Sequence, residues 1–366
     1  MNAIRNMLDS FWGRGDASIT IPSMDGALRP NDLLDQAIEV QVVQQPDNLT
    51  EYQGGLLYSS GNKIFQMNME ASAETPPRYE MPNDVSCLAS HPSGILAIGT
   101  TAGILLRGSK HEGTTISRLS GRPLACPTAL VFDGDNSLIV CIGSDRLSPG
   151  EWKRDLMEQG RSGSVWRIDL VGGESTCLVH GLGFPYGVQL VGSGALRVSE
   201  SWSHRIIQFR PGERPRPVLA DLPGYPSRIA PATDGGSWVS VFAPRRQMVE
   251  FVLRERDYRE RMLREVHSDY WMAPALSSGG SFLEPIQGGT VKHLGIRKPW
   301  APTRSYGLLV KLDASGTPVA SLHSRADGKR HGVTSCLEIG GKLAFTSKGG
   351  GVIACADLNL LKDEDE

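Results

Sequence analysis

Six residues able to do acid/base or ligand chemistry recur at one position of a repeated motif in this 366-residue chain. The motif is a Pro, one variable residue, any residue and a branched aliphatic; the sixth copy has Arg in place of Pro. The variable residues are Asp47, Asn83, Thr128, Tyr186, Ser227 and His331. A carboxylate holds a neighbouring imidazole in one tautomer, and the imidazole titrates near neutrality. We therefore expect His331 and Asp47 to form a catalytic general acid/base pair.

The other members of this set have supporting roles in the same hypothesis. Tyr186 could donate a hydrogen bond to a developing oxyanion, and Ser227 could be a nucleophile if His331 reaches it. The residues expected to bind substrate are Asn83, Thr128, Ser227 and Trp271. The alternative is that the polar side chains satisfy one another and plug a central channel.

Short apolar runs separated by polar turns follow every copy of the motif. After Pro185, for example, a second run covers residues 196–198 and a third covers residues 206–209. Such runs, bounded by Gly and Ser, predict antiparallel strands joined by tight turns. Six copies predict an all-β protein, a six-bladed β-propeller, because radial repetition protects the strand edges. The six variable residues would then converge at the mouth of the propeller.

The chain ends supply the ring closure. No strand-like run follows the third run of the last copy, whereas residues 38–43 form an unassigned β-type run before the first copy. We expect this N-terminal strand to close the last blade. The predicted organisation is an N-terminal extension over residues 1–37, a propeller over residues 38–358 and an acidic tail over residues 359–366.

Two insertions interrupt the repeat, at about residues 144–163 and 244–305. The first contains a short helical run from Glu151 to Glu158, and the second begins with one or two amphipathic helices over residues 246–267. Both lie between the second and third strands of a blade, so they should border the face where the variable residues converge. Long loops in compact domains are often functional. We expect a partly helical lid in blade five that contributes Trp271.

Composition excludes several classes of function. The net charge is −2, which gives no reason to expect nucleic acid as a partner. No apolar run approaches about 18 residues, so no membrane span is expected. The N-terminal residues also lack the apolar core of an export signal. We expect a cytoplasmic protein whose partner is a small-molecule substrate or ligand.

Four segments resemble a known family. They are GEWKRDLMEQGRSGSVWRIDL, HGLGFPYGVQL, VSESWSHRIIQF and ADLPGYPSRIAPATDGGSWVSVFAPR. They are similar to the strictosidine synthase-like branch of the six-bladed propellers that also include SMP-30/gluconolactonase-like proteins, diisopropyl-fluorophosphatase and paraoxonases. The resemblance implies a hydrolase of lactonase or esterase type, although one fold can host many activities.

The resemblance also implies a calcium ion at the mouth, held by oxygens from the starts of the inner strands. The matching positions here are Asp47, Thr128, Tyr186 and Ser227. Calcium binds six to eight oxygens with carboxylates among them, and only Asp47 keeps a carboxylate. The cofactor therefore stays open, and a calcium site, if present, is atypical.

Two hypotheses about function remain. The first is a small-molecule lactonase or esterase acting at the central mouth, with an atypical or absent metal site. The second is a non-catalytic propeller that binds a small molecule or a protein. The replaced calcium ligands favour the second, whereas the lid and His331 favour the first.

Overall fold

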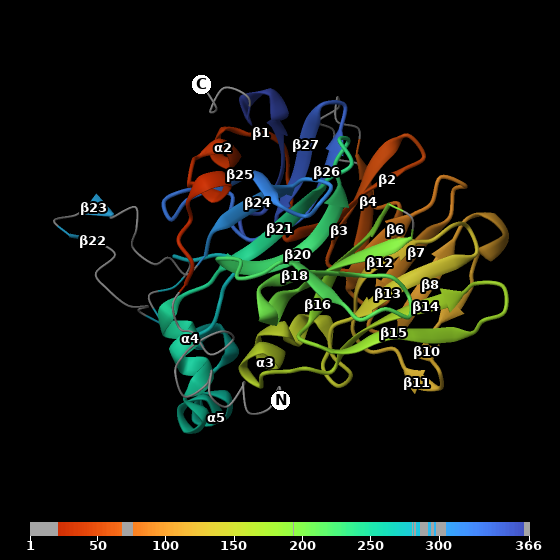
Figure 1. Ribbon diagram of the computed structural model, residues 1–366, viewed down its shortest axis with the longest axis horizontal. Coiled ribbons are helices and arrows are strands. Elements are labelled where there is room, and N and C mark those ends of the chain that lie inside the picture. Colours follow the sequence, from red (N-terminus) through yellow and green to blue (C-terminus); the bar gives the residue numbers. More distant parts are fainter. Residues whose placement is uncertain are drawn as a thin grey trace.

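The computed structural model describes residues 21–67, 76–192, 194–279, 281, 283–285, 292–293, 296–297 and 305–361. Six four-stranded antiparallel sheets dominate these residues. They follow one another in chain order around the molecule (Figure 1). The prediction of an all-β six-bladed propeller is confirmed.

Each blade is a meander in which sequential strands pair. Blade 1 contains β2 (Pro46–Tyr52), β3 (Gly55–Ser60), β4 (Lys63–Met67) and β5 (Tyr79–Glu80). Blade 2 contains β6 (Val85–Ser90), β7 (Leu96–Thr100), β8 (Gly103–Arg107) and β9 (Thr115–Ile116). Blade 3 contains β12 (Pro127–Phe132), β13 (Ser137–Ile142), β14 (Gly163–Asp169) and β15 (Ser175–Leu182).

The remaining blades follow the same plan. Blade 4 contains β16 (Pro185–Val191), β17 (Ala195–Glu200), β18 (Arg205–Phe209) and β19 (Arg216–Leu219). Blade 5 contains β20 (Gly224–Pro231), β21 (Ser237–Pro244), β24 (Gly307–Leu312) and β25 (Pro318–Ser324). Blade 6 contains β26 (Val333–Ile339), β27 (Lys342–Ser347), β28 (Val352–Asp357) and β1 (Ile38–Val42).

The inner strands form a closed ring. Each of β2, β6, β12, β16, β20 and β26 contacts the next, and β26 returns to β2. As predicted, the N-terminal β1 pairs with β28 and completes blade 6. The backbone N–H of Leu49 in blade 1 donates to Ser335 Oγ of blade 6 at 2.9 Å. Leu49 also packs in one buried apolar cluster with Ala344 and Ile353 of blade 6.

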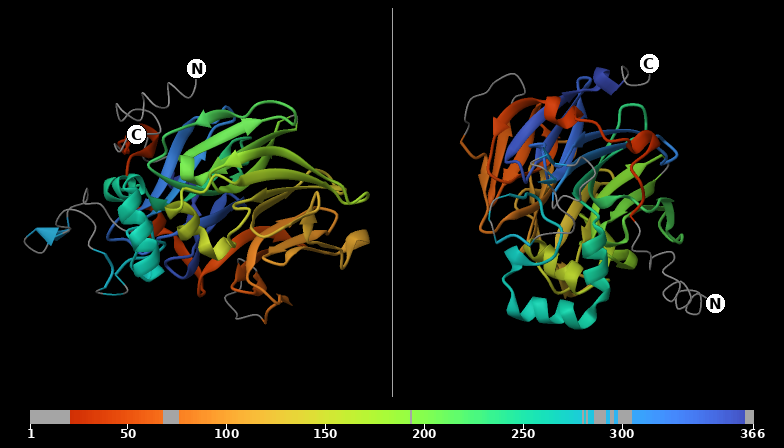
Figure 2. Two further views of the ribbon diagram at one scale, coloured as in Figure 1. Left: turned by 90° about the horizontal axis from the view of Figure 1, so that it is seen from below. Right: turned by 90° about the vertical axis from the view of Figure 1, so that its left-hand side faces the viewer.

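Helices lie in both predicted insertions. The first insertion contains the 3-10 turn η4 (Pro149–Glu151) and α3 (Trp152–Met157), and the second contains α4 (Gln247–Arg254) and α5 (Arg256–Glu265). Figure 2 shows α4 and α5 beside the ring of sheets, and α5 contacts α3. Gln159 Nε2 donates to the Leu253 carbonyl at 2.9 Å, which ties the two insertions together.

Shorter elements complete the described chain. They are η2 (Gly26–Leu28), α2 (Leu33–Gln36), η3 (Ser109–His111), β10 (Arg118–Leu119), β11 (Arg122–Pro123), η5 (Ser201–Ser203), η6 (Ser268–Tyr270), β22 (Lys292–His293), β23 (Ile296–Arg297) and η7 (Leu358–Leu361). Residues 1–20 of the expected extension, residues 362–366 of the expected tail and much of the second insertion after Gly279 lie outside the described residues. No helix in the described part of the chain is long and apolar enough to cross a membrane.

Buried contacts between neighbouring sheets hold the blades in place. Trp238 of β21 is fully buried, and its Nε1 donates to Glu338 Oε2 of blade 6 at 2.7 Å. Its ring packs in one cluster with Leu309, Leu343 and Phe345, which spans blades 5 and 6. This side chain therefore combines apolar burial with a charge-assisted hydrogen bond across one blade interface.

Substituting Trp238→Ala should lower the free energy of unfolding by about 3–5 kcal/mol, because it opens a cavity at this interface. Urea unfolding checks the value. The exposed Val171→Ala is the control and should change it by less than about 0.5 kcal/mol. A loss below about 1 kcal/mol for Trp238→Ala would show that the blade interface does not depend on this side chain.

Candidate functional site

A register shift near the start of each inner strand sets what faces the centre. The shifts lie between Pro127 and Ala129 in β12 and between Pro185 and Gly187 in β16. The corresponding shifts in β6 and β26 lie at Val85/Cys87 and Val333/Ser335. Bulges of this kind redirect side chains next to functional sites. In these four strands, the single residue inside the shift therefore occupies the central position of its blade.

This register corrects two positions of the predicted ring. Val85 and Val333 are the residues that precede the register shift in blades 2 and 6. Pro127 and Pro185 hold the same position in blades 3 and 4. The central residues of blades 2 and 6 are therefore Ser86 and Thr334, three residues after the predicted Asn83 and His331. The motif was matched three residues too early in these two blades, because they have Val where the others have Pro.

Asp47 does lie at the centre, and Asn48 positions it. Asn48 has a φ of 61°, a left-handed conformation that Asn tolerates better than most residues. Its side chain donates to Ser59 Oγ at 2.8 Å and its backbone N–H donates to Asp47 Oδ1 at 2.8 Å. The turn thus buries the Asp47 carboxylate, which is 4% exposed.

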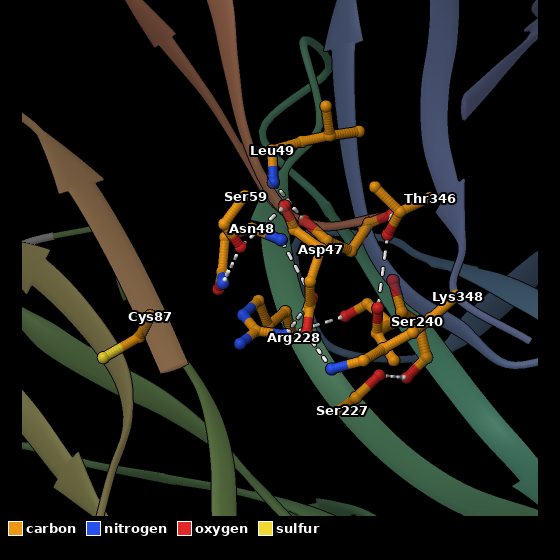
Figure 3. A network of polar contacts seen from close by, with 12 residues as sticks. Asp47, Asn48, Leu49, Ser59, Cys87, Ser227, Arg228, Ser240, Thr346 and Lys348 are labelled. Atoms are coloured by element: carbon orange, nitrogen blue, oxygen red, sulfur yellow. Dashed lines mark hydrogen bonds and ion pairs between the residues drawn. The ribbon is translucent and has the colours of Figure 1, made fainter. Parts of the chain in front are cut away.

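Two cations that sequence reasoning missed bind this carboxylate. Arg228 Nη1 lies 2.7 Å from Asp47 Oδ1 and Lys348 Nζ lies 3.1 Å from Asp47 Oδ2. Figure 3 shows both side chains converging on Asp47 from β20 and from the end of β27. Arg228 also donates to the Ser86 carbonyl at 2.6 Å. The three residues form a buried ion network with one net positive charge, because two cations meet one carboxylate.

A sequence signal for Arg228 existed. It follows the variable residue of the fifth motif, where the other copies have Asn48, Asp84, Ala129, Gly187 and Gly332. Arg228 is the only base at that position. Gly187 gives it room, because a Cβ there would clash with the Ser227 carbonyl oxygen and the Arg228 backbone.

The ion network fixes the charge of its members. Burial raises the pKa of Asp47, but Arg228 and Lys348 outweigh burial and hold this pKa below its ordinary value. Burial lowers the pKa of Lys348, but Asp47 and Tyr186 outweigh burial and hold it above its ordinary value. Both groups therefore stay charged across the neutral pH range.

Tyr186 lies against the same network. The Arg228 guanidinium carbon is 5.1 Å from the centre of the Tyr186 ring. Burial, together with the Asp47 charge, raises the pKa of the Tyr186 phenol. The phenol consequently keeps its proton at neutral pH and remains a hydrogen-bond donor.

The side chains of the other two predicted central residues, Thr128 and Ser227, form hydrogen bonds with backbone carbonyls. Thr128 Oγ1 donates to the Pro185 carbonyl at 2.5 Å, and Ser227 Oγ donates to the Ser240 carbonyl at 3.1 Å. Both residues are buried. Thr128 lines the mouth cavity described next, but Ser227 does not. Ser227 therefore holds neighbouring strands together, and its predicted role as a nucleophile has no geometric support.

A cavity of about 1370 Å³ opens above the ion network. Asp47, Asn83, Tyr186 and Lys348 line it. Its aromatic wall consists of Trp152, Phe184, Tyr186, Phe242, Tyr270 and Trp271. Both insertions contribute to this wall, as expected from their positions between second and third strands. Trp271 is anchored there by its Nε1, which donates to the Val266 carbonyl at 2.8 Å. Whether the second insertion acts as a lid stays a prediction.

His331 lies outside the ion network. Its Nδ1 is 2.8 Å from Ser305 Oγ and its Nε2 is 2.7 Å from the Arg325 carbonyl oxygen. It lines a smaller neighbouring hollow instead of the mouth cavity. The expected pair of His331 with Asp47 is therefore not formed, because each binds other partners.

The donor set at the centre does not fit calcium. Among the described residues, Asp47 is the single carboxylate at the centre, and two cations already neutralise it. The hydroxyls of Thr128 and Ser227 donate to backbone carbonyls. Within the described residues, no group of three or more His, Cys, Asp or Glu side chains could hold a metal ion. A divalent cation at this position would meet the repulsion of Arg228 and Lys348.

Comparison with known proteins gives a consistent result. No family model matches the chain. The protein strictosidine synthase-like 13 of Arabidopsis thaliana is 25% identical over 152 residues, which are 40% of this chain and 36% of that relative. The match thus spans little more than a third of the length of the curated relative.

Solved structures share the fold over nearly the whole chain. A gluconolactonase from Xanthomonas campestris has a TM-score of 0.56 and 14% identity, covering 92% of this chain and 96% of its own. Regucalcin from Agrobacterium tumefaciens, a calcium-binding protein, has a TM-score of 0.55 and 10% identity, covering 87% and 92%. The chain therefore shares the fold of these structures and is similar over part of its length to a strictosidine synthase-like protein.

The ion network at the centre of the propeller should be a large contributor to stability. Asp47→Asn leaves two partly buried cations without their buried carboxylate and should cost about 3–5 kcal/mol at pH 7 by urea unfolding. Because the folded pKa of Asp47 lies below its ordinary value of 3.8, its contribution is complete above that value and is lost as pH falls through the folded pKa. The difference between wild type and variant should therefore be constant from pH 5 to 8 and shrink below about pH 4.

Asp135→Asn is the matched control, because it removes the exposed pair of Asp135 with Lys110. Such surface pairs contribute about 0–1 kcal/mol. Equal losses of unfolding free energy for the two variants would show that the buried network stabilises the protein no more than a surface ion pair does.

Proposed function

We propose that the protein is a small-molecule hydrolase of lactonase or esterase type that works at the mouth of the propeller without a catalytic calcium ion. The observation that carries the proposal is the Lys348 ammonium on the wall of a large aromatic-lined cavity. Two solved structures of the same fold are described as gluconolactonases, one of them putative, which supports this class of chemistry.

Lys348 is the group best placed to act on a substrate. An ammonium has three N–H donors, and within the described residues Asp47 is its one hydrogen-bond partner. Its side chain is 26% exposed, whereas that of Arg228 is 13% exposed. Lys348 can therefore donate to the carbonyl oxygen of an ester and stabilise the negative charge that develops there. In this proposal the fixed cation takes over the electrostatic role of a metal.

Tyr186 and Asp47 complete the proposed machinery. The protonated Tyr186 phenol can donate a second hydrogen bond to the same oxyanion. Asp47 stays ionised and holds Lys348 and Arg228 in place, so it is a positioning residue. Its lowered pKa makes it a weak base.

The charges around the cavity favour an uncharged substrate. Besides Asp47 and Lys348, four carboxylates and two bases line it: Asp84, Glu151, Asp269 and Glu284 against Lys153 and Arg154. A neutral ester or lactone would meet less repulsion near these residues than a multiply charged anion. The aromatic wall would hold the apolar part of such a compound.

A second candidate is a non-catalytic propeller that binds a small molecule in the same cavity. The observation in its favour is that Asp47, Lys348 and Tyr186 all keep one protonation state near neutrality. The ion network itself thus supplies no general base. Ligand binding without turnover by the wild-type protein would select this candidate.

The proposal predicts hydrolysis of phenyl acetate or a simple γ- or δ-lactone that is unchanged by a calcium chelator. Lys348→Met should lower kcat/KM at least tenfold, because it removes the proposed oxyanion donor. Activity is followed by product release with purified protein, with added chelator and with added calcium.

The control is Lys342→Met, which changes an exposed lysine at the other end of the same strand. It should leave kcat/KM within twofold. Chelator-sensitive hydrolysis with stoichiometric bound calcium would overturn the metal-free mechanism, and full activity of Lys348→Met would overturn the role of Lys348.

A further inference from the structure

A second hollow of about 480 Å³ lies next to the mouth cavity. The two share Ser277 and the backbone of residues 349–351 as wall. The second hollow is also lined by Ser278, Lys329 and His331. It therefore combines a hydroxyl, a cation and an imidazole beside the proposed substrate cavity.

Three side chains there form a directed chain of hydrogen bonds. His331 Nε2 lies 2.7 Å from the Arg325 carbonyl oxygen, and a carbonyl only accepts, so Nε2 carries the proton. In the neutral ring Nδ1 is then an acceptor. The 2.8 Å contact between Ser305 Oγ and Nδ1 must be donated by Ser305.

The direction of hydrogen-bond donation can also be assigned between Ser305 and the exposed Ser278. Ser305 has a single hydroxyl proton, which it gives to His331. The 2.8 Å contact between Ser278 Oγ and Ser305 Oγ must therefore be donated by Ser278. The order of donation is Ser278 to Ser305 to His331, and the Arg325 carbonyl fixes the tautomer of the imidazole.

Burial decreases along this chain of hydrogen bonds from His331 to Ser278, as an accessible nucleophile with a shielded base requires. Ser305 and His331 are 0% and 7% exposed, whereas Ser278 is exposed and lines the hollow. The base is thus shielded from solvent and the terminal hydroxyl is accessible. This is the arrangement of an activated serine, in which a base oriented by a third group receives the hydroxyl proton.

We infer that Ser278 is a nucleophile for acyl groups of small esters, activated by His331 through Ser305. The inference rests on the proposed function, because the ion network at the mouth lacks a general base and this relay supplies one beside it. Its substrate class is an uncharged or singly negative ester whose carbonyl reaches the shared wall of the two cavities.

The reaction balances as an acyl transfer followed by hydrolysis. Ser278 Oγ forms a bond to the carbonyl carbon, its proton passes to Ser305 Oγ, and the Ser305 proton passes to His331 Nδ1. The bond to the leaving alkoxide breaks, and the alkoxide takes a proton back from the imidazolium along the same path. Water then attacks the acyl-serine with the same base, giving the acid and free Ser278.

A fluorophosphonate probe tests the nucleophile directly, because Ser278 Oγ would displace its fluoride and form a stable phosphonyl ester. The full chain is incubated with the probe and the modified residue is identified by peptide mass spectrometry. Label at Ser278 is expected in the wild type, with none in Ser278→Ala and at least tenfold slower labelling in Ser305→Ala and His331→Ala.

Ser93 provides the matched control, because its hydroxyl lies 2.8 Å from the Nδ1 atom of His91 in an exposed turn with no third partner of this kind. Ser93→Ala should label at the wild-type rate. A wild-type chain that is not labelled, or is labelled at another serine, would overturn the inference.

Hydrolysis of phenyl acetate separates the two proposals. Turnover that Lys348→Met abolishes and Ser278→Ala leaves intact would refute Ser278 as nucleophile and keep the proposed function. Label at Ser278 in a chain without any esterase or lactonase turnover would keep the nucleophile and refute the proposed function. Loss of turnover in both variants supports both.

Discussion

One buried carboxylate between two partly buried cations is the constraint around which the centre of this propeller is arranged. Asp47 comes from blade 1, Arg228 from blade 5 and Lys348 from the end of β27 in blade 6. A buried charge is tolerated only when it is paired and hydrogen-bonded. The strands must therefore bring these three residues together, and the left-handed turn at Asn48 and the glycine at position 187 both serve that approach.

This network also separates the chain chemically from a calcium-centred propeller. In the proposed metal-free site, Arg228 and Lys348 supply positive charge at the mouth as part of the chain itself. Such a charge cannot be removed by chelation and does not depend on metal supply. It is also smaller and less adaptable than a metal, because Lys348 offers hydrogen bonds where calcium offers open coordination positions.

The fold could be predicted from the sequence because the repeat is local and recurs six times. Short apolar runs, Gly-rich turns and one unassigned N-terminal run were enough to give the blades and the closing strand. The site was predicted only in part. Asp47, Thr128 and Tyr186 line the mouth cavity, where they were expected, because Pro46, Pro127 and Pro185 mark the start of their strands; their roles stay predictions.

Asn83 and His331 precede the central positions of blades 2 and 6, because Val85 and Val333, the last residues of these two motif copies, begin the strands where Pro begins them in other blades. Arg228 was not predicted because the repeated motif assigns no role to the residue that follows the variable one. Lys348 could not be found by any local pattern, since a lysine beside a glycine-rich turn looks like a solvated residue until the ring is closed. The pairing of Ser305 with Ser278 likewise depends on the path of a long insertion.

The closing strand β1 has a consequence for how the protein is made. Blade 6 combines residues 38–42 with residues 333–357, so its sheet cannot be completed until residue 357 has been synthesised. Domains generally begin to fold from the N-terminus during synthesis, yet here β1 has to wait for β28, the strand with which it pairs. Closure of the ring thus depends on a pairing between the two ends of the repeat, which no contact between neighbours in sequence can replace.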